Sequence, residues 1–184
     1  GKTAYLRGWG RASYTTGADF TPDTVVQQGS TSKAVTAWAV MELVEQGVLG
    51  LDDPIQPHLK TWTIPSPNSS WSDGVTVRRL LSHTAGIGLP GLSGFIAHVP
   101  TTVEALSAQK DRCCLIKGTW APGQGDTRVK SEPGAGWSYS TGGYHILQLL
   151  LEEKWTSDYG FANTMRRRLL NPLKMKKSTF GAKA

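Results

Sequence analysis

Long apolar runs are absent from this sequence of 184 residues. None reaches the roughly 18 residues that a membrane span needs, and no basic, apolar leader of the secretory type opens the chain. The only two cysteines, Cys113 and Cys114, are adjacent, which excludes a disulfide framework and the ligand spacing of a zinc site. The G-x-S-x-G, H-E-x-x-H and P-loop patterns are also missing, which excludes those routes to a hydrolase or a nucleotide-binding enzyme.

The composition indicates a globular domain with many turns. Aliphatic, aromatic and cysteine residues make up 39% of the chain, and it also contains 21 glycines. Together they bring the apolar share close to that of ordinary globular proteins. This length suits one domain with a buried core, so we interpret residues 1–184 as a single domain.

Positive charge is concentrated near the end of the chain. The net charge is +6, and no acidic residue follows Asp158. The cationic residues of this part are Arg166, Arg167, Arg168, Lys174, Lys176, Lys177 and Lys183. Such a cluster can bind nucleic acid or an anionic membrane, but no nucleic-acid-binding motif accompanies it. We favour a solvated helix face with its exit loop, expect no nucleic-acid partner, and keep a basic nucleic-acid-binding module as the weakest alternative.

An apolar run at residues 34–47 predicts a buried helix at the centre of the chain. Ser30 or Thr31 is the expected N-cap, and Gly47 is the expected left-handed residue just past the last turn. The stripe that we expect to be buried comprises Ala34, Ala37, Trp38, Met41, Val44 and Val48, with Val40 and Leu43 beside it.

Ser30 and Lys33 stand three residues apart where this helix begins, so their side chains can touch. A serine hydroxyl becomes a strong nucleophile when an adjacent base takes its proton, and a lysine is such a base only while uncharged. Neutrality at pH 7 costs roughly 4.6 kcal/mol for a lysine of ordinary pKa. The helix dipole supplies at most about 2 kcal/mol of this, so burial would have to supply most of it.

The residues around this pair favour catalysis over a chance cap and a solvated charge. Strand-like Val25 and Val26 run directly into the Q-G-S-T-S-K sequence of residues 28–33. This stretch resembles the first motif, S-x-x-K, of the serine β-lactamase and penicillin-binding protein superfamily. The resemblance implies that Ser30 is the nucleophile and Lys33 its base.

Further matches to this superfamily follow in order along the chain, and the resemblance extends from about Tyr5 to Phe180. They are the D-D-P-I sequence at 52–55, the T-V-R-R-L-L-S-H-T-A-G sequence at 76–86 and the P-L-K-M sequence at 172–175. His83 lies in the second of these elements, which is structural in relatives, so we expect it to pack under the site. The other histidines, which we expect at the surface or in core hydrogen bonds, are His58, His98 and His145.

Residues 132–144 read E-P-G-A-G-W-S-Y-S-T-G-G-Y and resemble the second motif of the superfamily with its lead-in. The resemblance places Tyr139 in the catalytic group, where its phenol relays a proton; taken alone, a buried tyrosine with a satisfied hydroxyl is the simpler interpretation. Thr141 stands where asparagine is more common, and we expect it to contact substrate. A threonine offers one hydroxyl where asparagine offers a donor and an acceptor, which favours an esterase-like or peptidase-like branch.

The rest of the chain predicts short elements joined by long loops. We expect an irregular strand at residues 2–13. The expected loops lie at 58–73, 88–100 and 107–130, the last being a lid or an insertion. The expected helices lie at 75–86, 101–106, 146–153 and 159–170. Gly86 is expected to end the first of these, and Thr101 or Thr102 to cap the second.

The resemblance implies an α/β (α+β) fold of the serine β-lactamase type, an antiparallel sheet packed on helices with a mostly helical lobe. This chain is expected to hold mainly the helical part. The implied function is a serine hydrolase that acts through an acyl-enzyme on an amide or ester, as in an esterase, a D-amino peptidase or carboxypeptidase, or a β-lactamase. The backbone amide of Ser30 would be one oxyanion donor. The substrate would be a small molecule or a peptide, and no metal or cofactor is implied.

The superfamily's third motif, a Lys or His followed by Thr or Ser and Gly, has no counterpart after Phe180. We therefore expect a fragment truncated at both ends, whose missing sheet a complementary chain could supply. The alternative is a catalytically silent fragment or paralogue that binds a peptidoglycan-like ligand or a partner chain. Relatives suggest a periplasmic or extracellular location.

Overall fold

The computed structural model describes residues 2–88, 101–107, 127–155 and 160–181. Within these ranges the chain is helical, and β-pairing is limited to isolated bridges, for example between Ile87 and Val129. The helices are η1 (Gly29–Thr31), α1 (Ser32–Glu45), η2 (Gln56–His58), α2 (Ser69–Gly74), α3 (Val77–Leu81), α4 (Thr102–Ser107), α5 (Thr141–Lys154), α6 (Gly160–Met165) and the π-helical turn η3 (Arg166–Leu170).

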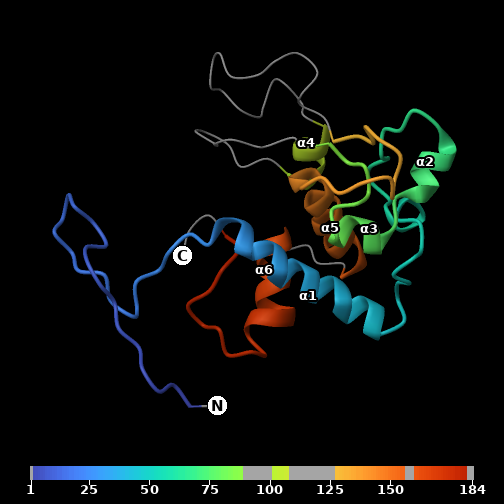
Figure 1. Cartoon of the computed structure of the whole chain (residues 1–184). Coiled ribbons are helices and arrows are strands. Elements are labelled where there is room, and N and C mark those ends of the chain that lie inside the picture. Colours follow the sequence, from blue (N-terminus) through green and yellow to red (C-terminus); the bar gives the residue numbers. More distant parts are fainter. Residues whose placement is uncertain (1, 89–100, 108–126, 156–159, 182–184) are drawn as a thin grey trace.

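Helix α5 is the centre of the core and packs against α1, α3, α4 and α6 (Figure 1). Its buried residues include Ile146, Leu147, Leu149, Leu150 and Leu151, which face several neighbours at once. The helix begins at Thr141, five residues before the predicted start. Ser140 caps it, because its hydroxyl accepts a hydrogen bond from the amide of Gly143 at 3.0 Å.

Helix α1 begins and ends close to the predicted positions. The short helix η1 leads into it, so the N-cap Thr31 makes no side-chain capping bond. At the other end Gly47 adopts φ +69°. The amide of Gly47 donates a hydrogen bond to the carbonyl of Val44, and the amide of Val48 donates one to the carbonyl of Leu43. This is the Schellman pattern, in which glycine tolerates the left-handed conformation. The expected role of Gly47 is confirmed.

The predicted buried stripe of α1 is wrong at its exposed members, although the expected burial of Val40 and Leu43 beside it is confirmed. The buried residues are Thr36, Ala39, Val40 and Leu43, which lie on the side toward α5. On the predicted stripe, Trp38 is 61% exposed, Met41 40% and Val48 45%. A helix that is apolar over most of its circumference carries no sequence signal for which side is covered, so the packing partner decides. In this structure α1 therefore presents an exposed apolar face.

The predicted strand at residues 2–13 is not present. This part has a single isolated bridge, between Arg11 and Asp19, and Tyr5, Leu6 and Trp9 are exposed. Figure 1 shows the segment before η1 running away from the helices as an extended trace. A strand requires a neighbouring strand for its backbone hydrogen bonds, and none lies beside it among the described residues. Val25 and Val26 are likewise exposed and form no strand.

Short capping residues set several of the smaller helices. Thr101 caps α4, since its hydroxyl accepts from the amide of Glu104 while the Glu104 carboxylate accepts from the amide of Thr101. Asn68 caps α2, a helix inside the segment 58–73 that we predicted as loop, by accepting from the amide of Trp71. Helix α3 ends at Leu81, earlier than the predicted stop at Gly86, although Gly86 does adopt φ +68°.

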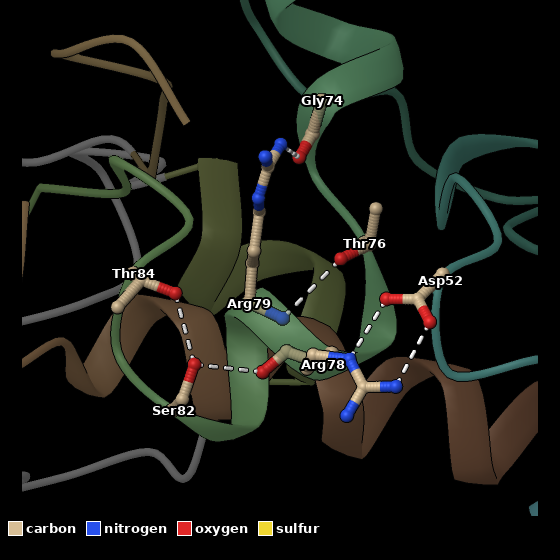
Figure 2. A network of polar contacts seen from close by, with 7 residues as sticks. All are labelled: Asp52, Gly74, Thr76, Arg78, Arg79, Ser82 and Thr84. Atoms are coloured by element: carbon tan, nitrogen blue, oxygen red, sulfur yellow. Dashed lines mark hydrogen bonds and ion pairs between the residues drawn. The ribbon is translucent and has the colours of Figure 1, made fainter. Parts of the chain in front are cut away.

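Arg78 of α3 ties the stretch at 76–86 to the stretch at 52–55, and Arg79 holds the beginning of α3 (Figure 2). The Arg78 guanidinium makes two hydrogen bonds of 2.8 Å to the Asp52 carboxylate, which holds the pKa of Asp52 below its usual value. The Arg79 side chain donates to the carbonyl of Gly74, and its amide donates to the Thr76 hydroxyl. These contacts fix α3, and with it the turn that carries His83.

Residues 83–88 run beside residues 128–138, which brings two distant motifs together. Main-chain bonds join Gly88 to Arg128, Lys130 to Gly86, Gly134 to Thr84 and Ser138 to His83. The predicted loops at 88–100 and 107–130, with Cys113 and Cys114, lie largely outside the described residues. The helix predicted at residues 159–170 is found as α6 followed by η3. None of the described helices combines the length and the apolar character required to cross a membrane.

Candidate active site

The stretch Gln28 to Lys33 places a hydroxyl and an amine together at the beginning of α1. Ser30 lies in η1, and Gly29 before it adopts φ +52°, a conformation that glycine takes without strain. Lys33 lies in the first turn of α1. Its Nζ donates a hydrogen bond to Ser30 Oγ at 3.3 Å, so the predicted contact between the two side chains is confirmed.

Tyr139 also contacts Ser30, although it lies 109 positions further along the sequence. Its hydroxyl donates a hydrogen bond to Ser30 Oγ, with 2.8 Å between the oxygens. Lys33 Nζ lies 4.9 Å from the centre of the Tyr139 ring and 5.7 Å from that of Tyr144, within the range of cation–π attraction. The three side chains that the resemblance singled out therefore meet at Ser30 Oγ.

The electrostatics of the group favour ionisation of the tyrosine. Hydrogen bonding by Lys33, and then by Ser30, lowers the pKa of Tyr139 below the ordinary tyrosine value. The cause is that both partners stabilise the phenolate more than the neutral phenol. A phenol with a lowered pKa beside a serine hydroxyl and an amine can pass a proton in either direction. The arrangement therefore provides a nucleophile and two groups able to exchange its proton.

The site is open to solvent. Ser30 is exposed, Lys33 and Tyr139 are partly exposed, and Trp137, two residues before Tyr139, is 68% exposed. A substrate can therefore approach Ser30 directly. Burial of Lys33 is less complete than we expected from the apolar helix, because only one face of α1 is covered.

Thr141, the predicted substrate contact, is the first residue of α5 and is partly exposed. It follows the cap Ser140 and lies two positions after Tyr139 in the sequence. Its role toward substrate remains a prediction. Among the described residues, no group of three or more His, Cys, Asp and Glu side chains is arranged to hold a metal ion.

His83 packs against Tyr139, which agrees with its expected place under the site. Its ring centre is 4.6 Å from that of Tyr139 and 5.2 Å from that of Tyr144. The Tyr144 hydroxyl in turn donates to the carbonyl of Leu81 at 3.1 Å. These rings form the floor on which Tyr139 rests. The H-T-A-G sequence at residues 83–86 pointed to His83. Its contact with Tyr139 could not be predicted, because it depends on the pairing of residues 83–88 with residues 128–138.

His145 is the other histidine close to the site. It lies on α5, and its Nδ1 is buried and has no hydrogen-bond partner among the described residues. Burial, followed by the charge of Lys33, lowers its pKa to about 4. The imidazole is therefore neutral at physiological pH. His58 is partly buried, with a pKa lowered by burial, and lies 3.9 Å from Asp53. His98 lies outside the described residues.

Comparison with known proteins agrees with the motifs. The family model "Beta-lactamase" matches residues 1–184. Penicillin-binding protein 4 of Amycolatopsis lactamdurans is 31% identical over 163 residues, which cover 89% of this chain and 38% of that protein. Esterase EstB of Burkholderia gladioli is 35% identical over 98 residues, which cover 51% of this chain and 24% of that protein.

The fold comparison leads to the same group of proteins. The octameric penicillin-binding protein homologue from Pyrococcus abyssi matches with a TM-score of 0.67 and 26% identity, over 95% of this chain and 37% of that one. The present chain thus spans between a quarter and two fifths of the length of these three relatives.

Proposed function

The chain belongs to the β-lactamase family and carries the helical part of the serine β-lactamase fold, and we propose from this that it is a serine hydrolase working through an acyl-enzyme on Ser30. The observation that carries the proposal is the convergence of Lys33 Nζ and the Tyr139 hydroxyl on Ser30 Oγ, at 3.3 and 2.8 Å. Two proton-exchanging groups on one exposed serine are the arrangement that an activated nucleophile needs.

In the proposed reaction, Ser30 Oγ forms a bond to the carbonyl carbon of an ester or amide while its proton passes to Lys33, which can accept it only in its uncharged form. The backbone amide of Ser30 stabilises the resulting oxyanion. The tetrahedral intermediate then collapses, the bond to the leaving group breaks, and Tyr139 assists delivery of the proton to that group. Water attacks the acyl-enzyme by the reverse sequence, which releases the acid and regenerates the serine.

The substrate class is proposed from position 141. Relatives carry names such as penicillin-binding protein and esterase. Thr141 offers a single short hydroxyl at the start of α5, where an asparagine would offer both an amide donor and an acceptor. This favours ester or peptide substrates with fewer polar requirements over β-lactams.

Completion of the site by further β-strands is part of the proposal. Trp38 and Met41 form an exposed apolar face on α1, Val48 just past the end of this helix is also exposed, and a soluble domain ordinarily covers a face of this kind. We expect strands from a longer form of this chain or from a separate polypeptide to lie there. They would also supply the second oxyanion donor, whose loss alone lowers a rate by about 10²–10³.

The test is an intact-mass measurement after incubation with a fluorophosphonate probe. We expect one adduct on the parent chain and none on Ser30→Ala or Lys33→Ala. Circular dichroism and cooperative unfolding should show that all three proteins are folded. A folded parent that takes up no probe would refute the hydrolase proposal for this chain and support the alternative, a silent relative that binds a peptidoglycan-like ligand or a partner chain.

A further inference from the structure

His83 holds the main chain on both sides of Tyr139. Its carbonyl oxygen accepts a hydrogen bond from the amide of Ser138 at 2.9 Å, and its ring Nδ1 accepts one from the amide of Ser140 at 3.0 Å. Ser138 and Ser140 are the two immediate neighbours of Tyr139. One residue therefore fixes the position of the tyrosine backbone from both directions.

The ring of His83 also restricts the tyrosine side chain. It lies against the Tyr139 ring with 4.6 Å between centres and an interplanar angle of 36°, and against Tyr144 at 5.2 Å with the same angle. Packing of this kind limits the directions that the phenol can take. The Tyr139 hydroxyl is thereby kept within 2.8 Å of Ser30 Oγ.

The backbone of His83 is held in an unusual conformation. Its φ is +61°, in the left-handed region that few residues other than glycine occupy, histidine being among those that do so more often. The neighbours on either side anchor this turn, since the hydroxyls of Ser82 and Thr84 lie 2.9 Å apart and Ser82 also donates to the carbonyl of Arg78 (Figure 2). Strain that the surrounding structure maintains often accompanies a functional requirement.

The protonation state of His83 follows from these bonds. Because Nδ1 accepts from an amide, the ring carries its proton on Nε2 and is neutral. The titratable groups that face the His83 ring are Lys33 from α1, Tyr139 from the segment before α5, and Tyr144 from α5 itself. Arg79 of α3 is directed to the carbonyl of Gly74 instead. Burial, and then the charge of Lys33, lower the pKa of His83, so Nδ1 remains an acceptor down to a lower pH than in an ordinary histidine.

We propose that His83 is a positioning residue whose neutral ring and main chain hold the Tyr139 hydroxyl on Ser30, and whose protonation at Nδ1 releases the Ser140 amide and loosens that contact. The catalytic consequence rests on the function proposed above. The positioning itself does not, since it can be measured on the chain without any substrate.

Two substitutions separate the parts of this role. His83→Asn keeps an acceptor oxygen near the place of Nδ1 and tolerates the left-handed backbone. His83→Gly tolerates the same backbone but removes both the acceptor and the ring. Neither adds strain at φ +61°, so a difference between the two variants reports the side chain.

The first readout is NMR of the full chain with ring-labelled tyrosine, in which the Tyr139 signal is assigned from Tyr139→Phe. In the parent and in His83→Asn, we expect the phenol to titrate below the ordinary tyrosine range. In His83→Gly we expect it to return toward that range, because Lys33 and Ser30 no longer meet a fixed hydroxyl. The Ser140 amide signal should shift as the parent is acidified through the range in which His83 gains its proton, and should not do so in His83→Asn.

The second readout is the rate of fluorophosphonate labelling. We expect His83→Gly to label at least about tenfold more slowly and His83→Asn to stay within about threefold of the parent, as one retained hydrogen bond would allow. An unchanged Tyr139 titration in folded His83→Gly, or a Ser140 amide insensitive to acid in the parent, would overturn the inference. A parent that does not label would count against the proposed function alone, and the NMR result would still decide the role of His83.

Discussion

The phenolic hydroxyl of Tyr139 donates a hydrogen bond to Ser30 Oγ across 109 positions of sequence. Ser30 precedes α1 and Tyr139 precedes α5, so the contact exists only when these two helices pack. Lys33, which is close to Ser30 in sequence, lies near Tyr139 for the same reason. The candidate site is therefore a property of the α1–α5 pair, and the following predictions test its parts.

Removal of the Tyr139 hydroxyl should slow labelling of Ser30. We expect Tyr139→Phe to react with the fluorophosphonate probe about tenfold to a hundredfold more slowly, because one proton-relaying group is lost. The matched control is Tyr144→Phe, whose hydroxyl donates to the Leu81 carbonyl. That variant should label much faster than Tyr139→Phe and lose only about 1 kcal/mol of unfolding free energy. Equal labelling rates for the two variants would argue against the role of Tyr139.

Introduction of asparagine at position 141 should change selectivity. Thr141→Asn adds an amide donor and acceptor at the start of α5. We expect the ratio of labelling by a fluorescent penicillin to labelling by the fluorophosphonate to rise several-fold over that of the parent. Thr141→Ser, which keeps only the hydroxyl, serves as the control. A ratio that does not respond to asparagine would show that position 141 does not set the substrate class.

Gly86 should not tolerate a side chain. Its φ is +68°, and an added Cβ would lie 2.1 Å from the carbonyl oxygen of Ser131, which belongs to the segment paired with it. We expect Gly86→Ala to lose about 2 kcal/mol or more of unfolding free energy in urea titrations. Gly136→Ala is the matched control, because no atom lies within 4 Å of its added Cβ. It should stay within about 0.5 kcal/mol of the parent.

His145 should make the fold sensitive to acid. Its pKa falls from 6.5 to about 4 in the folded chain, so the unfolded chain binds a proton first as the pH drops. Stability is therefore full above pH 6.5 and declines toward pH 4, by about 3 kcal/mol from this residue. His145→Leu should show a flatter dependence of unfolding free energy on pH over that interval. Two parallel curves would mean that His145 is solvated in the folded state.

The sequence predicted the parts of the fold that follow local rules. The left-handed stop at Gly47 and the cap at Thr101 depend on residues that are close in sequence, and both are found. The contact between Ser30 and Lys33 follows from helical spacing in the same way. The ordered series of motifs identified the family, although no single motif would have done so.

Features that depend on distant partners were missed. The start of α5 was placed too late because Gly142 and Gly143 are poor helix formers. They are tolerated there since Ser140 caps the helix and Gly143 is buried, its Cβ position 3.5 Å from Leu80. The exposed face of α1 and the absence of a strand at residues 2–13 have the same physical reason. A hydrophobic pattern shows that a surface is suited to burial, but burial also requires another part of the fold to pack against that surface.

Ser30 contacts Tyr139, which is held at the beginning of α5. The reactivity of Ser30 therefore depends on how well the core around α5 is packed. Tyr139 is held at the beginning of a helix whose buried leucines pack under α1, so loosening that packing moves the phenol before the chain unfolds. A cavity-forming change such as Leu43→Ala, which is remote from the hydroxyl in sequence, should lower probe uptake together with stability. A short peptide spanning residues 28–45 should not react with the fluorophosphonate probe, because it lacks the Tyr139 hydroxyl that contacts Ser30 Oγ.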